Sequence, residues 1–373
     1  MIMKYLFLQN TMAPYRVSLF NKLYEMGLNI EVLYMCEMES YRSWIIDKSI
    51  IKYPYEIANG YKGKIAGVDI YWCPSFIKRF IREKDCHIIL GGAWIYLDVI
   101  ICCILKRLKV IKNQLSFWSE ANYLTNGARK KNKLRDMLRS FVYNSGEGMV
   151  IVPGKMAVET FEIWGLNNKK FKFLPNVIEE ELFLNISKNN HKFTSLEVKP
   201  KFVMPVRLNE SVKGIINFFK AIGEKNVKKA YFYILGNGPD EEKIRQFIIE
   251  NGYSENIELC GFCKMTIVAD YYQKSDVLVL PSFSDPSPLS LVEGCCCKLP
   301  LLVSLRCGNH YETVIDGVNG YTFDPDDHRS IKSAFDKLLA DRFKWKQMGM
   351  ESRQLFEENF LQEKVLKRFI NSL

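Results

Sequence analysis

The sequence lacks any run of about 18 apolar residues, the length that a membrane-spanning helix needs. The stretch that comes nearest, residues 94–108 (WIYLDVIICCILKRL), is interrupted by Asp98 and ends in a basic pair, so it predicts a buried core helix. Only four histidines are present, without the spacing of metal ligands, and no internal repeat or low-complexity tract stands out. These absences argue against a membrane-spanning protein, a histidine metal site and a repeat architecture.

The N-terminus shows no secretory signal. Eleven cysteines are present, but those at 102–103 and 295–297 stand in adjacent runs that cannot serve as a disulfide framework. Most have apolar neighbours and are expected to pack as small hydrophobic residues. We therefore expect a reducing, cytoplasmic compartment. The pair Cys260-x-x-Cys263 stands alone, without a second pair or a nearby His, so we expect neither a metal nor a redox cofactor there.

Positive charge is concentrated in the first half of the chain. Residues 1–195 contain 28 Lys and Arg against 18 Asp and Glu, whereas residues 196–373 contain 24 of each kind. Such basic clusters, mixed with Phe, Ile and Leu, suit an anionic membrane surface at about 1 kcal/mol per well-placed cation, and a solvated helix face is the alternative. We find no nucleic-acid recognition motif and expect no nucleic-acid partner. The basic residues are densest in 78–84, 106–112 and 129–139.

The length of 373 residues is enough for two domains, and apolar runs alternate with helical patterns twice along it. We expect an α/β protein with an N-terminal Rossmann-like domain at 1–180 and a C-terminal one at 201–358. A connection at 181–200 joins them, and a helix at 359–373 packs back on the N-terminal domain. Strands are expected at 4–8, 29–35, 85–90, 113–118, 148–152, 171–174, 201–206, 231–235, 256–259, 276–280 and 299–303. Helices are expected at 15–26, 129–143, 327–340, 343–358 and 361–372, with others beginning near 212 and 240.

The most informative stretch is 281–323, which follows the apolar run of the strand expected at 276–280. A polar loop carries Asp285, and Glu293 lies eight positions further on. After the next strand, a loop contains Gly308. Two carboxylates at the carboxyl ends of strands in an open sheet lie where α/β proteins bind ligands. The spacing and charge alone do not name a reaction.

This stretch resembles the signature of retaining GT-B glycosyltransferases of the family-4 type. The matching features are a loop acid (Asp285), a second acid (Glu293) followed by small residues, a Leu-Pro-Leu-Leu-Val-Ser segment at 299–304 and the pattern from Asp316 to Phe323. The resemblance is tight over about 201–325 and loose before that. It implies a GT-B fold with two Rossmann-like parallel-sheet domains facing an interdomain cleft, and a metal-independent hexosyltransferase.

Arg207 and Lys213 match the family's Gly-Arg-Leu…Lys-Gly segment, and the resemblance implies that they clamp the donor diphosphate. Glycosyl transfer leaves negative charge on the departing diphosphate, which two fixed cations stabilise as it develops. A planar guanidinium and a compact ammonium suit two different oxygens. Surface ion pairs are the alternative role for both residues.

The resemblance also assigns the two acids. Glu293 matches the acid that holds the ribose hydroxyls, and Asp285 matches the acid that contacts the donor sugar. The family usually has Glu and a glycine-rich turn here, whereas Asp285 is shorter and is followed by Pro286-Ser287-Pro288, whose prolines have no N–H. The identity of the donor sugar is therefore in doubt, and an inactive relative is an alternative. The amides available for the donor belong to Ser287, Leu289 and Ser290.

Further candidates lie in other loops. Gly236 and Gly238 form a glycine turn that lines the nucleotide side of the cleft in the family. Pro14-Tyr15-Arg16 resembles an opening of some family members that approaches the diphosphate and the acceptor. A helix N-terminus favours an anion in any family, although Tyr15 and Arg16 are equally compatible with structural roles. Glu120, after an expected strand, is a candidate for acceptor binding or a helix cap.

Two features are expected to be bystanders. The acidic run 324–327 precedes a helix, where carboxylates are favourable without a metal, so we do not expect a metal site. His310, in the loop of Gly308, is expected to be solvated.

The sequence thus predicts transfer of a hexose from a nucleotide-diphosphate sugar, a UDP-sugar or a GDP-sugar, without a cofactor. The acceptor is expected to be a saccharide or a polyprenyl-linked saccharide in bacterial surface-polysaccharide synthesis. The protein would then work in the cytoplasm, at the inner face of the plasma membrane. The alternatives are a nucleotide-sugar 2-epimerase on the same fold and an inactive, membrane-associated binding protein.

Overall fold

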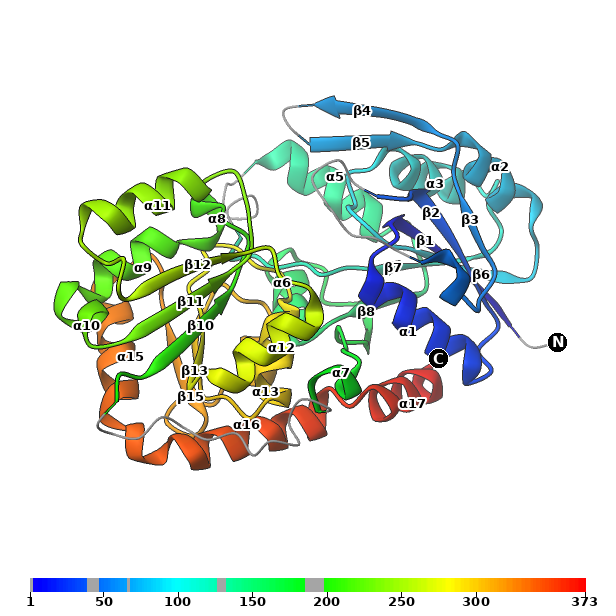
Figure 1. The fold of residues 1–373 in the computed structure, drawn as a ribbon. Helices are drawn as coiled ribbons and strands as arrows, with labels where there is room; N and C mark the ends of the chain where they lie inside the picture. Colours follow the sequence, from blue (N-terminus) through cyan, green and yellow to red (C-terminus); the bar gives the residue numbers. More distant parts are fainter. Residues whose placement is uncertain (1–2, 39–46, 66–67, 126–131, 185–197) are drawn as a thin grey trace.

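The computed structural model describes the chain except residues 1–2, 39–46, 66–67, 126–131 and 185–197. It contains two open parallel sheets side by side, each with helices on both faces, so each half of the chain is an α/β domain (Figure 1). This arrangement confirms the expected fold class. No helix among the described residues combines the length and the hydropathy that crossing a membrane requires.

The N-terminal sheet has seven described strands in the order β3-β2-β1-β6-β7-β8-β9, all parallel. Strand β1, in the interior of this sheet, begins at Lys4. Five of its eight residues in succession are buried, as expected for a strand covered on both faces. The strands are β1 (Lys4–Thr11), β2 (Ile30–Cys36), β3 (Tyr55–Ile57), β6 (Cys86–Leu90), β7 (Gln114–Trp118), β8 (Met149–Val152) and β9 (Lys170–Phe173). The helices are α1 (Pro14–Glu25), α2 (Pro74–Arg82), α3 (Leu97–Arg107), α5 (Lys133–Tyr143) and α6 (Lys155–Ile163), with a 3-10 turn, η1 (Lys48–Ile50). The next helix, α7 (Glu180–Leu184), packs on the C-terminal domain, because its Phe183 is buried in the core of that domain. An antiparallel hairpin of β4 (Tyr61–Ile65) and β5 (Val68–Trp72) stands apart from the sheet.

The C-terminal sheet has six described strands in the order β12-β11-β10-β13-β14-β15, again all parallel. The order reverses between β10 and β13, which creates the kind of crevice at the carboxyl ends where open α/β sheets bind ligands. The strands are β10 (Lys201–Pro205), β11 (Tyr231–Leu235), β12 (Ile257–Gly261), β13 (Val277–Leu280), β14 (Leu301–Ser304) and β15 (Gly320–Phe323). The helices that follow them are α8 (Glu210–Lys213), α9 (Ile215–Ile222), α10 (Glu224–Lys228), α11 (Glu241–Glu250), α12 (Met265–Lys274), α13 (Leu289–Cys296) and α14 (His310–Thr313).

The chain then returns to the N-terminal domain. Helix α15 (His328–Ala340) and the 3-10 turn η2 (Arg342–Lys344) lead into α16 (Trp345–Asn359), and α17 (Gln362–Ser372) crosses to lie beside α1 (Figure 1). The side chains of Val365, Leu366 and Phe369 are buried in the same apolar cluster as Phe7 and Phe20 of the N-terminal domain. The last helix therefore ties the two domains together.

Two details differ from the sequence expectations, and part of a third prediction is not tested. Helix α3 has only one buried face, because Leu97 and Ile104 are more than 40% exposed while Cys102 and Cys103 are fully buried. The helix expected near Val212 is split, because Gly214 adopts a left-handed φ of 61° between α8 and α9. The basic residues 129–131 lie outside the described residues.

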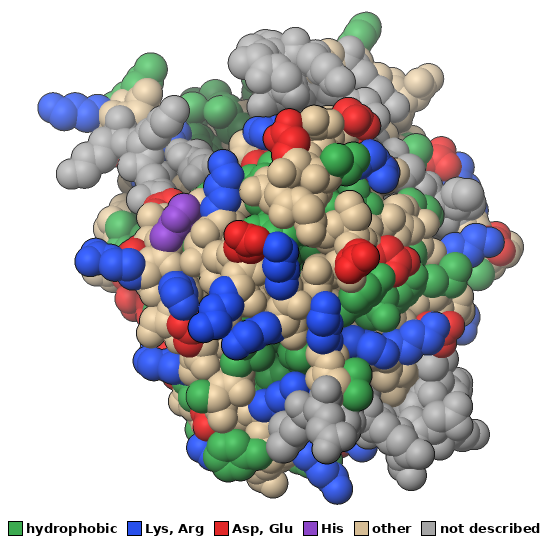
Figure 2. Space-filling model, turned by 60° about the vertical axis from the view of Figure 1, so that its left-hand side comes forward, with side chains coloured by type: hydrophobic (Ala, Val, Ile, Leu, Met, Phe, Trp, Pro, Cys, Tyr) green, Lys and Arg blue, Asp and Glu red, His purple; other side chains and the backbone are tan. Residues whose placement is uncertain are grey.

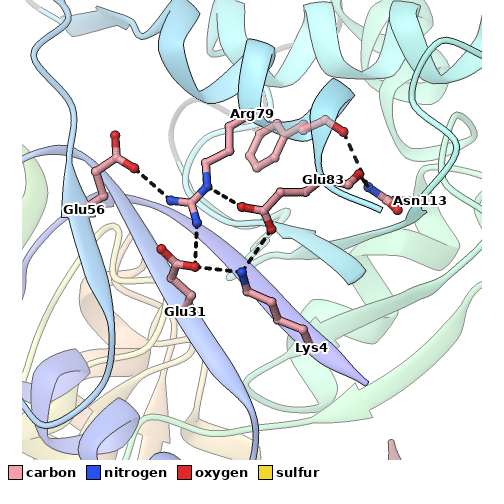
Figure 3. Close-up of polar contacts among 7 residues, drawn as sticks. Lys4, Glu31, Glu56, Arg79, Glu83 and Asn113 are labelled. Atoms are coloured by element: carbon pink, nitrogen blue, oxygen red, sulfur yellow. Dashed lines mark hydrogen bonds and ion pairs between the residues drawn. The ribbon is translucent and has the colours of Figure 1, made fainter. Parts of the chain in front are cut away.

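A network of ion pairs closes the amino-terminal edge of the N-terminal sheet (Figure 3). Arg79 of α2 contacts Glu31 at 2.6 Å, Glu56 at 2.8 Å and Glu83 at 2.5 Å. Lys4 contacts Glu31 at 2.9 Å and Glu83 at 3.0 Å. Arg79 of the basic segment 78–84 is therefore neutralised by one acid of its own segment and by two that are distant in sequence.

Positive charge is not confined to the N-terminal domain. Figure 2 shows the outer face on the C-terminal side, where Lys and Arg side chains gather across the middle with acidic side chains among them. Some cations of the C-terminal domain are paired within a helix, as Lys228 is with Glu224 and Lys332 with Asp336. The excess of +10 in the first half of the sequence thus does not by itself mark one basic face.

Candidate active site

The loops at the carboxyl ends of the C-terminal strands bring Lys213 and Asp285 into contact. The ammonium of Lys213, the last residue of α8, forms an ion pair with Oδ2 of Asp285, in the loop after β13. The two side chains are 17% and 15% exposed. These residues are 72 positions apart in sequence, so their contact comes from the strand order of the sheet and not from local structure.

Backbone hydrogen bonds fix the two loops that carry this pair. The amides of Phe283 and Ser284 donate to the carbonyl of Val212 at 2.9 Å and 3.1 Å. On the other side, the amide of Gly308 donates to the carbonyl of Asp285 at 2.9 Å. A Cβ at position 308 would lie 1.8 Å from the carbonyl oxygen of Pro286, so only glycine allows this approach.

Arg207 lies exposed in the loop between β10 and α8. The glycine turn predicted to line the cleft packs directly against this loop. A Cβ on Gly236 would lie 2.1 Å from the carbonyl oxygen of Val206, and one on Gly238 would lie 2.3 Å from that of Leu208. The amide of Leu208 donates to the carbonyl of Asn237 at 2.9 Å. The two glycines therefore hold the Arg207 loop by close backbone approach.

Glu293 is buried in the middle of α13 and accepts a hydrogen bond from the hydroxyl of Tyr272 at 2.6 Å. Burial disfavours the charged carboxylate and raises the pKa of Glu293 to about 7, although the Tyr272 hydrogen bond works in the opposite direction. The phenol of Tyr272 is itself buried, and desolvation raises its pKa well above its ordinary value. A ligand whose hydroxyls donate hydrogen bonds to Glu293 would favour the ionised form of this carboxyl group.

The predicted amide donors stand at the start of α13. Pro288 is the N-cap, and Leu289 and Ser290 are the first two helical residues, where backbone N–H groups have no partner within the helix. Ser287 precedes them, and its carbonyl accepts a hydrogen bond from the side chain of Asn176 at 3.4 Å. The loop of Asp285 thus continues into a helix start that reaches the N-terminal domain.

On the N-terminal side, the structure brings Arg16 and Glu120 together. Pro14 is the first residue of α1, and the guanidinium of Arg16 contacts Glu120 Oε1 at 2.6 Å. The same guanidinium lies over the ring of Trp118, 3.9 Å from the centroid, and 5.3 Å from that of Tyr15. Glu120 therefore bonds to side chains, and the described residues that follow it, 121–125, form no helix for it to cap.

Two residues that the sequence interpretation missed connect the domains. Asn176, after β9, is 3% exposed and donates to Glu120 Oε1 at 3.1 Å as well as to Ser287. Arg306 donates to the carbonyl of Leu124 at 3.0 Å, and its own carbonyl accepts from Asn122 at 3.1 Å. The position of Asn176 after an apolar strand was the available signal, whereas nothing in the sequence distinguished Arg306 as an interdomain residue.

The structure also describes the acidic run 324–327 and His310. Asp327 is the N-cap of α15 and accepts from the amide of Arg329 at 2.9 Å, and Asp326 pairs with Arg306 at 2.7 Å. Within the described part of the chain, no three His, Cys, Asp or Glu side chains gather as metal ligands. The expectation for His310 is wrong, because this residue is 5% exposed and its Nδ1 lies 2.7 Å from the carbonyl oxygen of Cys307.

Comparisons with known proteins agree with this fold. Residues 186–359 match the family model "Glycosyl transferases group 1". An uncharacterized glycosyltransferase of Methanocaldococcus jannaschii, MJ1178, is 32% identical over 135 residues, which are 36% of this chain and 38% of that protein. The alpha-monoglucosyldiacylglycerol synthase of Acholeplasma laidlawii is 27% identical over 194 residues, 48% of this chain and 47% of that protein. The alignments therefore span less than half the length of these two curated relatives.

The likeness in structure extends over both domains. Anabaena HepE in complex with UDP superposes with a TM-score of 0.73 at 14% identity, covering 99% of each chain. At that identity the likeness concerns the fold. Residues 186–359 are similar to the group 1 glycosyltransferases, and the chain as a whole has the two-domain GT-B fold.

Proposed function

We propose that the protein is a retaining glycosyltransferase that transfers a hexose from a nucleotide-diphosphate sugar to a saccharide acceptor. The observation that carries this proposal is the contact between Lys213 and Asp285. A glycosidic bond joins the donor's sugar directly to its diphosphate. A cation for the phosphate and a carboxylate for the sugar hydroxyls must therefore be neighbours, as these two residues are.

The chemistry follows from this placement. The bond between the sugar C1 and the phosphate oxygen breaks, and its electron pair leaves with the nucleoside diphosphate. The acceptor oxygen forms the new bond to C1 on the same face, and its proton passes to the leaving phosphate. Lys213 and Arg207 stabilise the developing negative charge, while Glu293 holds the ribose hydroxyls. No metal is needed for charge stabilisation in this scheme.

The donor and acceptor are assigned by similar reasoning. A UDP-sugar is the first choice of donor, with a GDP-sugar as the alternative, and HepE of the same fold was solved with UDP. We place the acceptor on the N-terminal domain, next to Arg16 and Glu120. A lipid-linked saccharide in surface-polysaccharide synthesis fits an enzyme that works at the inner face of the membrane, and the Acholeplasma relative is named for a lipid product.

A thermal-shift panel of UDP, GDP, ADP and their hexose derivatives tests the donor site. We expect one diphosphate and its sugar to raise the melting temperature, and the matching sugar to be transferred with release of the diphosphate. The variant Lys213→Gln should lose the shift. Lys220→Gln, an exposed lysine of α9 in the same domain, is the matched control and should keep it. An epimer formed from the donor alone would instead identify a 2-epimerase, and no binding of any diphosphate would contradict the proposal.

A membrane-binding face is supported by α3 and α5, which pack against each other. Each helix exposes large apolar side chains beside basic residues. Leu108 is 66% exposed next to Lys109, and Leu134 is 70% exposed next to Lys133. Apolar and cationic side chains together suit an interface with anionic lipid.

Liposome flotation tests this face. Binding should require anionic lipid and weaken with salt, because charge attraction is screened. The double variant Lys109→Glu with Leu134→Ser should reduce flotation at least about fivefold. The loss of one cation alone accounts for this factor, because each cation near an anionic surface contributes about 1 kcal/mol. Lys229→Glu, exposed on the C-terminal domain, is the matched control. Equal flotation with neutral and anionic vesicles would remove the proposal.

A further inference from the structure

The loop at 121–125, which follows β7, contacts the C-terminal domain close to Asp285. Asn122 of this loop is 4% exposed, and its Nδ2 donates to the carbonyl oxygen of Arg306, in the loop after β14, at 3.1 Å. Arg306 reaches back, because its Nη1 donates to the carbonyl of Leu124 at 3.0 Å. A reciprocal pair of hydrogen bonds therefore joins the two domains at this point.

The carbonyl that Asn122 contacts also holds Asp285. The backbone amide of Asp285 donates to the same oxygen of Arg306 at 3.4 Å, and the amide of Gly308 donates to the carbonyl of Asp285 at 2.9 Å. Asp285 and Cys307 thus form an isolated parallel bridge. A Cβ at position 308 would lie 3.2 Å from Nδ2 of Asn122, so this side chain lies directly against the bridge. A displacement of the Arg306 carbonyl would displace the backbone of Asp285.

Local hydrogen bonds fix which end of the Asn122 amide meets Arg306. Its Oδ1 accepts from the backbone amide of Leu124 at 2.9 Å, and a backbone N–H can only donate. The NH2 group must therefore be the end that faces the carbonyl of Arg306. The backbone carbonyl of Asn122 also accepts from the hydroxyl of Thr125 at 2.9 Å. The loop thus presents a preoriented donor to the C-terminal domain.

Arg306 is anchored in its own domain as well. Its side chain is 7% exposed, and its Nη2 contacts Asp326 at 2.7 Å and Asp324 at 3.4 Å. Its backbone amide donates to the hydroxyl of Ser304, the last residue of β14, at 3.0 Å. Hydrogen bonds therefore run without interruption from the N-terminal loop, through Arg306, to the backbone of Asp285.

We infer that Asn122 is a positioning residue for the glycosyl transfer: through the carbonyl of Arg306, it fixes Asp285 beside Lys213 when the two domains are docked. This inference rests on the proposed function, in which Asp285 contacts the donor sugar. It gives a physical reason why the acid of the donor site depends on the acceptor domain. Rates are sensitive to such placement, since a shift of about 1 Å can cost about 100-fold.

Steady-state kinetics of Asn122→Asp test the inference. This variant still accepts from Leu124, but it replaces the NH2 donor with a carboxylate oxygen, which repels the carbonyl of Arg306. The donor is UDP-glucose, or the hexose derivative of GDP or ADP that raises the melting temperature. The acceptor probes are the methyl α-glycosides of glucose, galactose and mannose. We expect kcat to fall about 10-fold to 100-fold, while the acceptor KM and the calorimetric Kd of the nucleoside diphosphate change less than about twofold.

Asn113→Asp is the matched control. Asn113 is also buried, and its Nδ2 donates to the carbonyl of Glu83 at 2.7 Å, at the amino ends of the N-terminal strands (Figure 3). This variant should lose stability but keep kcat. If Asn122→Asp does not fold, Arg306→Lys gives the same test, because an ammonium keeps the charge but lacks the fork that reaches both the acids and the carbonyl of Leu124.

The kinetic constants separate positioning from a direct contact with the acceptor, since Asn122 and Pro286 both line a cavity of about 330 Å³ between the domains. A raised acceptor KM at unchanged kcat would identify such a contact and overturn the inference. Unchanged kcat and KM, or a nucleoside diphosphate affinity that falls as far as kcat, would overturn it as well. A wild type without turnover would instead overturn the proposed function, and this inference with it.

Discussion

Arg79 and Lys213 are both cations in ion pairs with carboxylates. Arg79 lies at the amino ends of the strands of its sheet, whereas Lys213 lies at the carboxyl ends of the strands of the other sheet. Arg79, at the amino-terminal edge, contacts three glutamates, and Lys4 contacts two of the same three (Figure 3). Lys213, at the carboxyl ends of the C-terminal strands, contacts one carboxylate among the described residues. The charges of the Arg79 network neutralise one another, whereas the Lys213–Asp285 pair can still bind the charged and polar groups of a ligand.

Buried polar atoms show the same contrast. Among the described residues around the cleft, Nη1 of Arg16, Oδ1 of Asn176 and Nε2 of Gln9 are buried without a hydrogen-bond partner. Unpaired buried polar atoms are rare in folded proteins because each costs about 1–3 kcal/mol. A cluster of them at the carboxyl edge indicates a surface arranged for a polar ligand. The paired network at the amino edge indicates a role in stability.

The largest expected effect comes from breaking the cleft pair. Lys213→Gln should lower turnover about 100-fold to 1000-fold, the usual cost of removing one group that stabilises a developing oxyanion. The melting temperature should change by only a few degrees, because the pair is near the surface. Steady-state kinetics and thermal unfolding measure the two quantities. If the variant instead loses much stability but its folded fraction keeps full activity, Lys213 has a structural role like that of Arg79, and the prediction is wrong.

The next largest effect concerns Glu293 and Glu31, whose contributions to the free energy of unfolding should change with pH in opposite directions. The folded pKa of Glu293 is raised from 4.5 to about 7, so folded protein holds this proton more tightly than unfolded protein. Its contribution to the free energy of unfolding therefore falls as pH rises from about 4.5 to 7, by roughly 3 kcal/mol. Glu293→Gln, which can still accept from Tyr272, should gain stability over the wild type across that window in pH-dependent chemical denaturation. Nucleotide affinity of the wild type should rise through pH 7, and that of the variant should stay flat and weaker.

Glu31 should behave in the opposite way. Burial would raise its pKa, but hydrogen bonds and charges from Arg79 and Lys4 outweigh burial and lower it. Its stabilising contribution is therefore present above the unfolded pKa near 4.5 and is lost as pH falls below that value. Chemical denaturation at a series of pH values should show that Glu31→Gln is less stable than the wild type at neutral pH. This loss in free energy of unfolding should disappear in acid. The same slope for Glu31→Gln and Glu293→Gln would contradict the comparison between the two edges.

The smallest expected effect is that of replacing Arg79, the centre of the ion-pair network. Arg79→Met should lower the free energy of unfolding by about 1–3 kcal/mol, between the values of exposed and fully buried pairs, because three carboxylates lose their common partner. Nucleotide affinity and turnover should not change, since the network lies away from the cleft. Urea denaturation and the same kinetic assays measure both. Lys84→Met, an exposed neighbour, is the matched control.

Much of the fold could be predicted from local pattern. The long apolar runs of β1, β11 and β13 and the last three helices lie within a few residues of their expected bounds. The short strands β3, β4, β5 and β15 were not predicted, because runs of three to five residues carry little periodic signal. The exposed face of α3 was missed for a related reason, since composition does not tell which side of an apolar helix meets the core.

The site was predicted in part. Motif resemblance named Lys213, Asp285 and Glu293, but not the pairing of the first two or the bond from Tyr272 to the third. Asn176 and Arg306 lie outside any chemical motif, and their importance comes from contacts between domains. The catalytic and binding roles of all these residues stay predictions.

The sequence by itself determined the elements and their alternation, because burial of apolar runs and the conformational limits of Gly and Pro act over a few residues. It also determined which acids and bases are available. The tertiary structure decided which of them meet: strand order brought Lys213 to Asp285, and the docking of two domains formed the cavity beside Pro286. Charge pairing depends on distances between residues far apart in the chain, and only the packed sheets fix those distances.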